Sequence, residues 1–225
     1  MRLWIKTNWL VRLLFRKYVW RIPNKDNKVY LTFDDGPTPE VTEWTLEQLK
    51  KYDAKATFFC IGDNISKYPD IFRKVIAEGH SVGNHTFHHL KGWETDTNNY
   101  VENVAKCNEE IAKGRRQKAE ENDNLKSAFC VLHSNLFRPP YGKINPLQSR
   151  KLRAKGYTII MWDIVSYDFD SGTSAEACLG NVLNNVESGS IIVFHDSVKA
   201  EGNLKYALPK TLKFLKEKGF VCERI

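Results

Sequence analysis

The fold of this chain is decided by the stretch Val29-Tyr30-Leu31-Thr32-Phe33-Asp34-Asp35-Gly36-Pro37. Its first five residues are apolar, aromatic or β-branched and predict a buried strand. Two carboxylates and a Gly-Pro turn follow directly where that strand ends. Enzymes built on parallel strands place their reactive groups at the carboxyl ends of those strands, so this stretch predicts both a strand and a site.

The same pattern recurs at four further points along the chain. In each, a short apolar run ends in polar or turn-forming residues: Ser81–Asn84 precedes His85-Thr86-Phe87-His88-His89, Leu136-Phe137 precedes Arg138-Pro139-Pro140-Tyr141-Gly142, Tyr157–Trp162 precedes Asp163 through Asp168, and Ser190–Phe194 precedes His195-Asp196. Parallel strands would bring these five distant segments together at one mouth of the fold.

Strands and helices alternate along the chain. We expect strands at Val29–Phe33, Ala56–Ile61, Ser81–Asn84, Leu136–Arg138, Tyr157–Trp162, Ser190–Phe194 and Phe220–Cys222. We expect helices at Glu40–Lys51, Pro69–Glu78, Tyr100–Lys113, Pro146–Lys155, Ser174 to about Val186, and Leu204–Lys218. Glycines that follow several of these helices, Gly114 among them, are typical helix ends. The alternation predicts an α/β fold with parallel strands, from which the charged stretch Arg115–Ala128 departs as a surface excursion.

The bulk composition fits one soluble domain. The length of 225 residues suits the size class of α/β barrels. The net charge of +7 is compatible with an anionic partner, but no arginine–aromatic recognition motif appears, so we expect no binding to nucleic acid. The five cysteines are odd in number and form no C-x-x-C pair, so we expect no disulfide framework.

Residues 1–25 differ in character from the main domain, which we expect over residues 26–225. Charges interrupt every apolar run of Met1–Trp20, so we expect neither a signal-peptide core nor a membrane-spanning helix. On a helix, one stripe is apolar (Leu3, Leu10, Val11, Leu14, Phe15, Tyr18) and the opposite side is basic (Arg2, Lys6, Arg12, Arg16, Lys17). Such a helix either lies on an anionic membrane or packs against the main domain, and we favour packing. We therefore expect, from the sequence alone, a cytoplasmic or membrane-peripheral protein.

Two histidines and two carboxylates suggest a metal site. His85 and His89 are four residues apart and would share one face of a helical turn. One carboxylate from a neighbouring strand end would complete a His-His-Asp set with positions left open for water, as in catalytic metal sites. Two alternatives are that His88 pairs with His85 and that the histidines form a hydrogen-bonded cluster without metal. The adjacent Asp34 and Asp35 favour a metal site, with one carboxylate as ligand and the other as base.

Five motifs together resemble the polysaccharide deacetylases, the NodB-homology family of carbohydrate esterases (family 4). In the family's order they are Thr32-Phe33-Asp34-Asp35-Gly36-Pro37, His85-Thr86-Phe87-His88-His89, Arg138-Pro139-Pro140-Tyr141, Asp168-Phe169 and Val193-Phe194-His195. Two positions depart from the common pattern: Phe169 stands where the family usually has tryptophan, and Val193 where it often has leucine. The resemblance spans most of the chain and implies a distorted (β/α) barrel with seven parallel strands.

The resemblance implies a metal cofactor. Asp35, His85 and His89 match the family's ligands of a divalent metal ion, which is commonly zinc. Cobalt, nickel or manganese would also suit this set of nitrogen and oxygen donors.

The resemblance also implies catalytic roles. Asp34 would be the general base toward the attacking water, and Arg138 would hold Asp34 ionised. The backbone N–H of Tyr141 would stabilise the oxyanion. His195 would protonate the leaving amine, and Asp168 would hold His195 in its imidazolium form.

Several of these residues have structural alternatives. Arg138 could serve only as a structural ion-pair partner, and Asp163 is an alternative partner for His195. Three aromatic residues are candidates for stacking on sugar rings: Trp93, Tyr141 and Phe169.

The sequence therefore predicts a metal-dependent hydrolase that removes N-acetyl groups from N-acetylglucosamine-type residues of a polymer or oligomer, such as peptidoglycan or chitin-like chains. The alternatives are an acetylxylan-type O-deacetylase, a non-catalytic carbohydrate-binding protein on the same barrel, and a membrane-surface protein whose N-terminal helix is the functional part. We expect a monomer, and the resemblance implies a place at the cell envelope.

Overall fold

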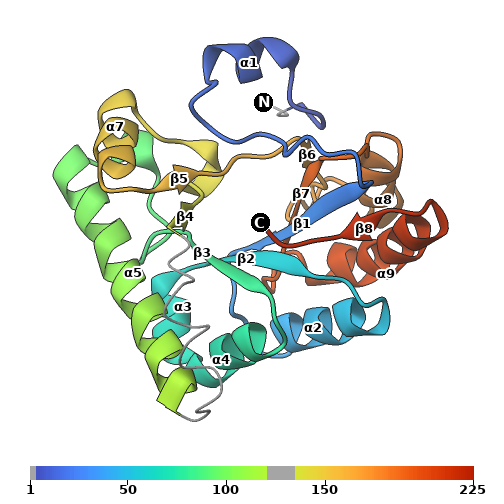
Figure 1. The fold of residues 1–225 in the computed structure, drawn as a ribbon, viewed down its shortest axis with the longest axis horizontal. Coiled ribbons are helices and arrows are strands. Elements are labelled where there is room, and N and C mark those ends of the chain that lie inside the picture. The colour runs from blue at the N-terminus through green and yellow to red at the C-terminus, as the bar shows by residue number, and fades with distance from the viewer. Residues whose placement is uncertain (1–3, 121–134) are drawn as a thin grey trace.

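The computed structural model describes residues 4–120 and 135–225 and centres on one curled parallel sheet (Figure 1). Its strands are β1 Lys28–Asp34, β2 Ala56–Cys60, β3 Ser81–Asn84, β4 Leu136–Phe137, β5 Thr158–Ile159, β6 Ile164–Val165, β7 Ile191–His195 and β8 Val221–Cys222. The strand order is β5-β4-β3-β2-β1-β7-β6, and β8 pairs separately with the beginning of β1. Every pairing between these strands is parallel, so the α/β barrel fold expected from the sequence is confirmed.

Helices surround the sheet (Figure 1). They are α1 Trp9–Leu14, α2 Val41–Lys51, α3 Gly62–Lys67, α4 Pro69–Ala77, α5 Thr97–Glu120, α7 Pro146–Ala154, α8 Ala175–Leu183 and α9 Glu201–Glu217. Short 3-10 turns lie at Gly92–Glu94 and Pro140–Gly142. Within the described part of the chain, none of the helices has the length and apolar character needed to cross a bilayer.

Strand β1 is the centre of the core. It pairs with β2 on one side and β7 on the other, and its residues from Val29 onward are all buried. Phe33 is fully buried and stacks on Phe58 and Phe194 of the two neighbouring strands, with centroid distances of 5.0 and 6.1 Å. A strand buried on both faces reads as a nearly continuous apolar run, which explains why the opening stretch was a strong signal.

The strand register brings the motif residues together. Asp34 at the end of β1 is the partner of His195 at the end of β7. Asn84 of β3 is the partner of Phe137 of β4, so His85 and Arg138 both follow at the next step along their strands. Parallel strands in register therefore place four of the five motifs at one edge of the sheet.

Some predicted elements differ from those observed. The sequence did not predict α3 or β6, and the predicted strand Phe220–Cys222 pairs beside β1 instead of extending the main path. The predicted helix Tyr100–Lys113 does not end at Gly114, because α5 continues to Glu120. A Cβ atom at Gly114 would lie 2.5 Å from the Phe72 ring of α4, so this glycine permits close helix packing and is not a helix end.

Consequently, the first part of the predicted excursion Arg115–Ala128 is wrong, because residues 115–120 are helical. Residues 121–128 lie outside the described residues. Four cysteines of the described chain (Cys60, Cys107, Cys178, Cys222) are free, as expected, and Cys130 also lies outside the described residues.

The N-terminal segment bridges the two ends of the sheet. The Val19 N–H donates to the Ile159 carbonyl of β5, and the Val165 N–H of β6 donates to the Ile5 carbonyl. Isolated bridges also join Lys6 to Ile164 and Val19 to Ile160. Because β5 and β6 do not pair with each other, the segment fills the seam between them.

The expected long amphipathic helix is not what forms in this segment. Its helix, α1, has six residues and none of them is buried. Two of the predicted basic residues, Lys6 and Arg12, form ion pairs with Glu187 and Asp163 on the main domain. The packing that we favoured forms in part, because Val11 and Tyr18 of the predicted apolar stripe pack against the core. Leu10, Leu14 and Phe15 of the same stripe stay exposed, and the polar side contacts the domain as well. The division of the chain at residue 25 stays a prediction.

Candidate active site

The structure brings the three predicted metal ligands together. Asp35 follows β1, and His85 and His89 follow β3. Oδ1 of Asp35 lies 3.2 Å from Nε2 of His89 and 3.6 Å from Nε2 of His85. One potential ligand atom from each residue lies within 4.8 Å of the others, a spacing at which a single cation can contact all three.

The His85 ring is fixed in the form that a metal ligand needs. Its Nδ1 lies 2.8 Å from the backbone carbonyl of Arg138, which can only accept a hydrogen bond. Burial lowers the pKa of His85 to about 4, although the charges of Asp34 and Asp35 oppose this shift. The ring is therefore neutral, with its proton on Nδ1 and the lone pair of Nε2 directed toward Asp35.

The histidines meet through a loop and not through the helical turn expected from their spacing. Thr86 and His89 have positive φ angles of 63° and 54°, so the backbone doubles back between the two ligands. The Thr86 hydroxyl accepts a hydrogen bond from the Leu90 N–H and closes this turn. The prediction that the two side chains meet was correct, but its helical reason was wrong.

Asn103 of α5 stabilises the same loop, and sequence reasoning missed it. Its side-chain oxygen accepts hydrogen bonds from the backbone N–H groups of Phe87 and His88, at 2.8 and 3.0 Å. Its Nδ2 lies 2.9 Å from Nδ1 of His88. His88 is therefore held by α5 and is not part of the ligand group. Nothing in the sequence singles out Asn103, because it lies on a helix far from every motif.

The donor set fits a divalent cation. Oδ1 of Asp35 is buried and has no hydrogen-bond partner among the described residues, which leaves it available to an ion. Burial opposes ionisation of this carboxyl, but the imidazoles of His89, His195 and His85 outweigh that effect and hold the pKa of Asp35 below its usual range. Two imidazole nitrogens and one carboxylate oxygen are donors typical of zinc and of other transition metals.

Asp34 and Arg138 form a buried ion pair beside the ligands. Asp34 is 4% exposed, Arg138 is fully buried, and Nη1 of Arg138 lies 2.7 Å from Oδ1 of Asp34. The guanidinium also donates to the Thr32 hydroxyl and to the carbonyls of Ile160 and Met161. These contacts are compatible with both roles considered for Arg138. They fix the side chain as a structural ion-pair partner would be fixed, and they direct its guanidinium at Asp34.

His195 is held by Asp168, as expected. Nδ1 of His195 lies 2.8 Å from Oδ1 of Asp168, whose other oxygen accepts the backbone N–H of His195. Burial alone would lower the pKa of His195, but Asp168 outweighs it and, with the charges of Asp35 and Asp34, raises that pKa to about 9. The alternative partner Asp163 instead accepts from Ser190 and pairs with Arg12.

Asp196 is a further residue of this region to which the sequence had assigned no role beyond a turn. Its carboxylate accepts hydrogen bonds from the Gly36 N–H at 3.1 Å and the Thr42 hydroxyl at 2.6 Å. Burial, with the nearby charge of Asp35, raises the pKa of Asp196 to about 8. A Cβ atom at Gly36 would lie 2.0 Å from Asp196, so only glycine fits there. The only sequence signal for Asp196 was its position directly after His195 at the end of a predicted strand.

The three predicted aromatic residues lie at different places. Tyr141, which has a positive φ of 59° and is 50% exposed, places its ring 4.7 Å from that of His89. Phe169 lies edge-on against His195 with a centroid distance of 4.8 Å. Trp93 is 67% exposed and lines a separate groove. A cleft of about 700 Å³ opens beside Asp35 and His89, a volume typical of small-molecule sites.

Comparisons with known proteins agree with this geometry. The family model described as polysaccharide deacetylase matches residues 21–160. The chain is 34% identical over 220 residues to a peptidoglycan-N-acetylglucosamine deacetylase of Bacillus cereus, covering 96% of this chain and 72% of that protein. It is also 34% identical over 179 residues to a chitooligosaccharide deacetylase of Azorhizobium caulinodans, covering 78% and 77% of the two chains.

A solved structure shows the same fold. The Bc1960 peptidoglycan N-acetylglucosamine deacetylase, in complex with 4-naphthalen-1-yl-N-oxidanyl-benzamide, superposes with a TM-score of 0.81 at 29% identity. The match covers 95% of this chain and 94% of that one. From its motifs, its sheet and these relatives, the chain belongs to the polysaccharide deacetylase family.

Proposed function

We propose that this protein hydrolyses the N-acetyl groups of N-acetylglucosamine-type residues in a polysaccharide or oligosaccharide. The observation that carries the proposal is the arrangement of a His-His-Asp ligand group beside a buried Asp34–Arg138 pair and an Asp168-held His195. Amide hydrolysis requires attack on an unreactive carbonyl and protonation of a poor leaving group, and this site holds one base and one acid in different environments. Relatives in the family are named as deacetylases of peptidoglycan and of chitooligosaccharides.

The residues divide the chemical work. Asp35, His85 and His89 would hold a divalent ion, which when bound polarises the acetyl carbonyl and lowers the pKa of water. Asp34, kept ionised by Arg138, takes a proton from the attacking water.

His195 and Asp168 serve the second half of the reaction, in which the amine leaves. His195 enters the reaction protonated and gives its Nε2 proton to the departing amine, while Asp168 stabilises the imidazolium. The Tyr141 N–H supports the oxyanion of the tetrahedral intermediate. All of these groups come from one chain, so we propose that a monomer is active.

The same machinery would cleave an acetyl ester, so O-deacetylation of an acetylxylan is the second candidate. A non-catalytic carbohydrate-binding role gains no support, because each position proposed as base, acid or ligand carries the side chain that its role requires.

Chelation tests the proposed function directly. We expect dialysis against a strong chelator to abolish acetate release from peptidoglycan or tetra-N-acetylchitotetraose, and added zinc or cobalt to restore it. Acetylated xylan in a parallel assay distinguishes the ester alternative. Thermal unfolding of the dialysed protein checks that the fold persists. Acetate release that is insensitive to chelation contradicts the proposal.

Asp34→Asn separates base from ligand. We expect the variant to keep its bound metal by elemental analysis while kcat falls about 10²- to 10⁴-fold, because the proton acceptor is gone. Asp35→Asn is the matched control and is expected to lose the metal. Loss of metal from Asp34→Asn instead would exchange the two proposed roles.

The pH profile reports on His195. His195 can donate a proton only while its imidazole is protonated. Activity is therefore expected to fall as the pH rises through the pKa of His195, about 9. Asp168→Asn removes the main interaction that raises this pKa, so the alkaline limb of the kcat profile should move to lower pH by roughly 1–3 units. Asp26→Asn, a change at an exposed carboxylate, serves as control. An unmoved limb in Asp168→Asn rules out this role.

We also propose that the N-terminal segment contacts an anionic membrane surface, which would place the enzyme at the periphery of a membrane. Large apolar side chains of α1 and its flanks are exposed: Trp4, Trp9, Leu10, Leu13, Leu14 and Phe15 are 48–76% exposed. The exposed Arg16 and Lys17 lie beside them. Apolar side chains next to free cations are typical of segments that lie in the interface of an anionic bilayer.

Vesicle sedimentation tests this contact. The double variant Trp9→Ser/Leu13→Ser should bind phosphatidylglycerol vesicles roughly tenfold more weakly than the unsubstituted protein, because less apolar surface is buried. Val221→Ser, an exposed valine on β8, is the control. Equal binding to purely zwitterionic vesicles, or equal sedimentation of the two variants, contradicts the proposal.

A further inference from the structure

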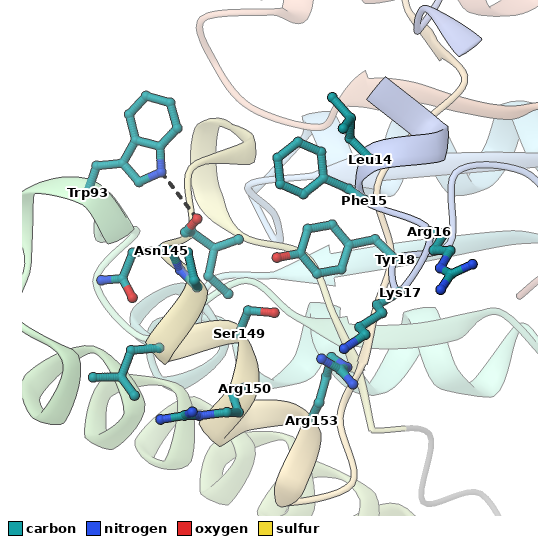
Figure 2. A pocket seen from close by; sticks show the side chains of 13 residues that line it. Leu14, Phe15, Arg16, Lys17, Tyr18, Trp93, Asn145, Ser149, Arg150 and Arg153 are labelled. Atoms are coloured by element: carbon teal, nitrogen blue, oxygen red, sulfur yellow. Dashed lines mark hydrogen bonds between the residues drawn. The ribbon is translucent and has the colours of Figure 1, made fainter. Parts of the chain in front are cut away.

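A second hollow lies outside the cleft at the metal ligands. It is a groove of about 860 Å³ between residues 14–18 of the N-terminal segment and the beginning of α7, with Trp93 at its far side (Figure 2). The rings of Phe15 and Tyr18 stack at 5.8 Å and 13° on one side. The groove therefore exists only because the N-terminal segment lies against the domain.

The walls of this groove suit a sugar chain. Trp93 and the Phe15–Tyr18 pair lie on opposite sides of the groove (Figure 2). The Trp93 indole N–H donates to the Ile144 carbonyl, which fixes the ring by its edge. Asn145 and Ser149 add polar groups between the aromatic walls. Aromatic faces with a few polar groups between them match the apolar faces and hydroxyl edges of pyranose rings.

All charged side chains that line the groove are positive. Four of its lining residues are cations, Arg16, Lys17, Arg150 and Arg153, and none of the lining residues is an aspartate or glutamate. Within the described part of the chain, none of these cations forms an ion pair, whereas Lys6, Arg12 and Arg21 nearby all do. Cations left without carboxylate partners along one groove select an anionic ligand.

Residues 141–143 have contacts both at the metal ligands and at the groove. Tyr141 contacts His89, and Nζ of Lys91 lies 5.5 Å from the Tyr141 ring centroid. Nζ of Lys143 lies 5.4 Å from the centroid of Trp93. One short segment, residues 141–143, therefore contacts a proposed metal ligand at its beginning and a groove residue at its end.

We propose that this groove binds an acidic stretch of the glycan, sugar residues that carry carboxylates, on the same chain as the residue being deacetylated. The inference rests on the proposed function and adds a substrate preference to it. Rings of the glycan stack between Trp93 and Tyr18, and its carboxylates lie against Arg150 and Arg153. Neutral chitin-like chains would gain the stacking but not the charge pairing.

Two tetrasaccharides of equal length test the proposal. One alternates N-acetylglucosamine with N-acetylmuramic acid and carries lactyl carboxylates, and the other, tetra-N-acetylchitotetraose, is neutral. Binding is measured by calorimetry on the metal-loaded full chain in an Asp34→Asn background, which prevents turnover. We expect the acidic chain to bind roughly tenfold more tightly, as for two exposed ion pairs. This preference should disappear at about 1 M salt, where the screening length is about 3 Å.

Two variants locate the preference. Arg150→Gln/Arg153→Gln should bring the ratio of the two affinities close to one. Lys50→Gln/Lys51→Gln removes the same charge from exposed positions on α2, on another side of the sheet, and should keep the preference (Figure 1). Thermal unfolding confirms that each variant is folded.

The outcomes separate this inference from the proposed function. Equal affinity for the two chains, or an equal loss of preference in the two double variants, overturns the groove assignment even when acetate is released. A preference for the acidic chain that depends on Arg150 and Arg153 supports the groove even if neither tetrasaccharide is deacetylated by the unsubstituted enzyme.

Discussion

The buried contact between Arg138 and Asp34 is the constraint on which the rest of the site depends. A buried ion pair is costly to desolvate and is tolerated only where further hydrogen bonds satisfy its remaining groups. Here the Thr32 hydroxyl and the carbonyls of Ile160 and Met161 satisfy the guanidinium. One side chain therefore joins β1 to the segment after β5, and the Arg138 backbone carbonyl orients His85 as well. The positions of Asp34, the proposed base, and of the His85 ring, a proposed metal ligand, depend on the same residue.

Two histidines of one site, His85 and the partly exposed His195, have opposite shifts in pKa, and their hydrogen-bond partners explain the difference. His85 faces a neutral backbone carbonyl, so burial dominates and its pKa falls to about 4. His195 faces the carboxylate of Asp168, which outweighs burial and raises its pKa to about 9. A neutral ring can bind a metal, and a protonated ring can act as an acid. The proposed division between a metal ligand and a proton donor thus follows from the hydrogen-bond partner of each ring.

The sequence predicted the site better than the elements that carry it. Residues at the ends of parallel strands must converge, so the positions of Asp35, His85, Arg138 and His195 after apolar runs were sufficient. Features that depend on tertiary packing were not predictable in this way. From sequence alone, Gly114 predicts a helix end, because its contact with Phe72 is visible only in the folded structure. Similarly, no motif links Asn103 to the loop that carries the histidines. In the N-terminal segment, periodicity indicated which residues are apolar but not which of them pack against the domain.

The seam between β5 and β6 has a consequence for how the protein is made. The segment that fills it is synthesised before its backbone partners, such as Ile159 and Val165, which follow more than a hundred residues later in the chain. Docking of the segment must therefore wait until most of the chain exists, and closure of the barrel is a late step of folding during translation. A bulky fusion attached ahead of this segment would hinder closure of the barrel more than a fusion attached after β8.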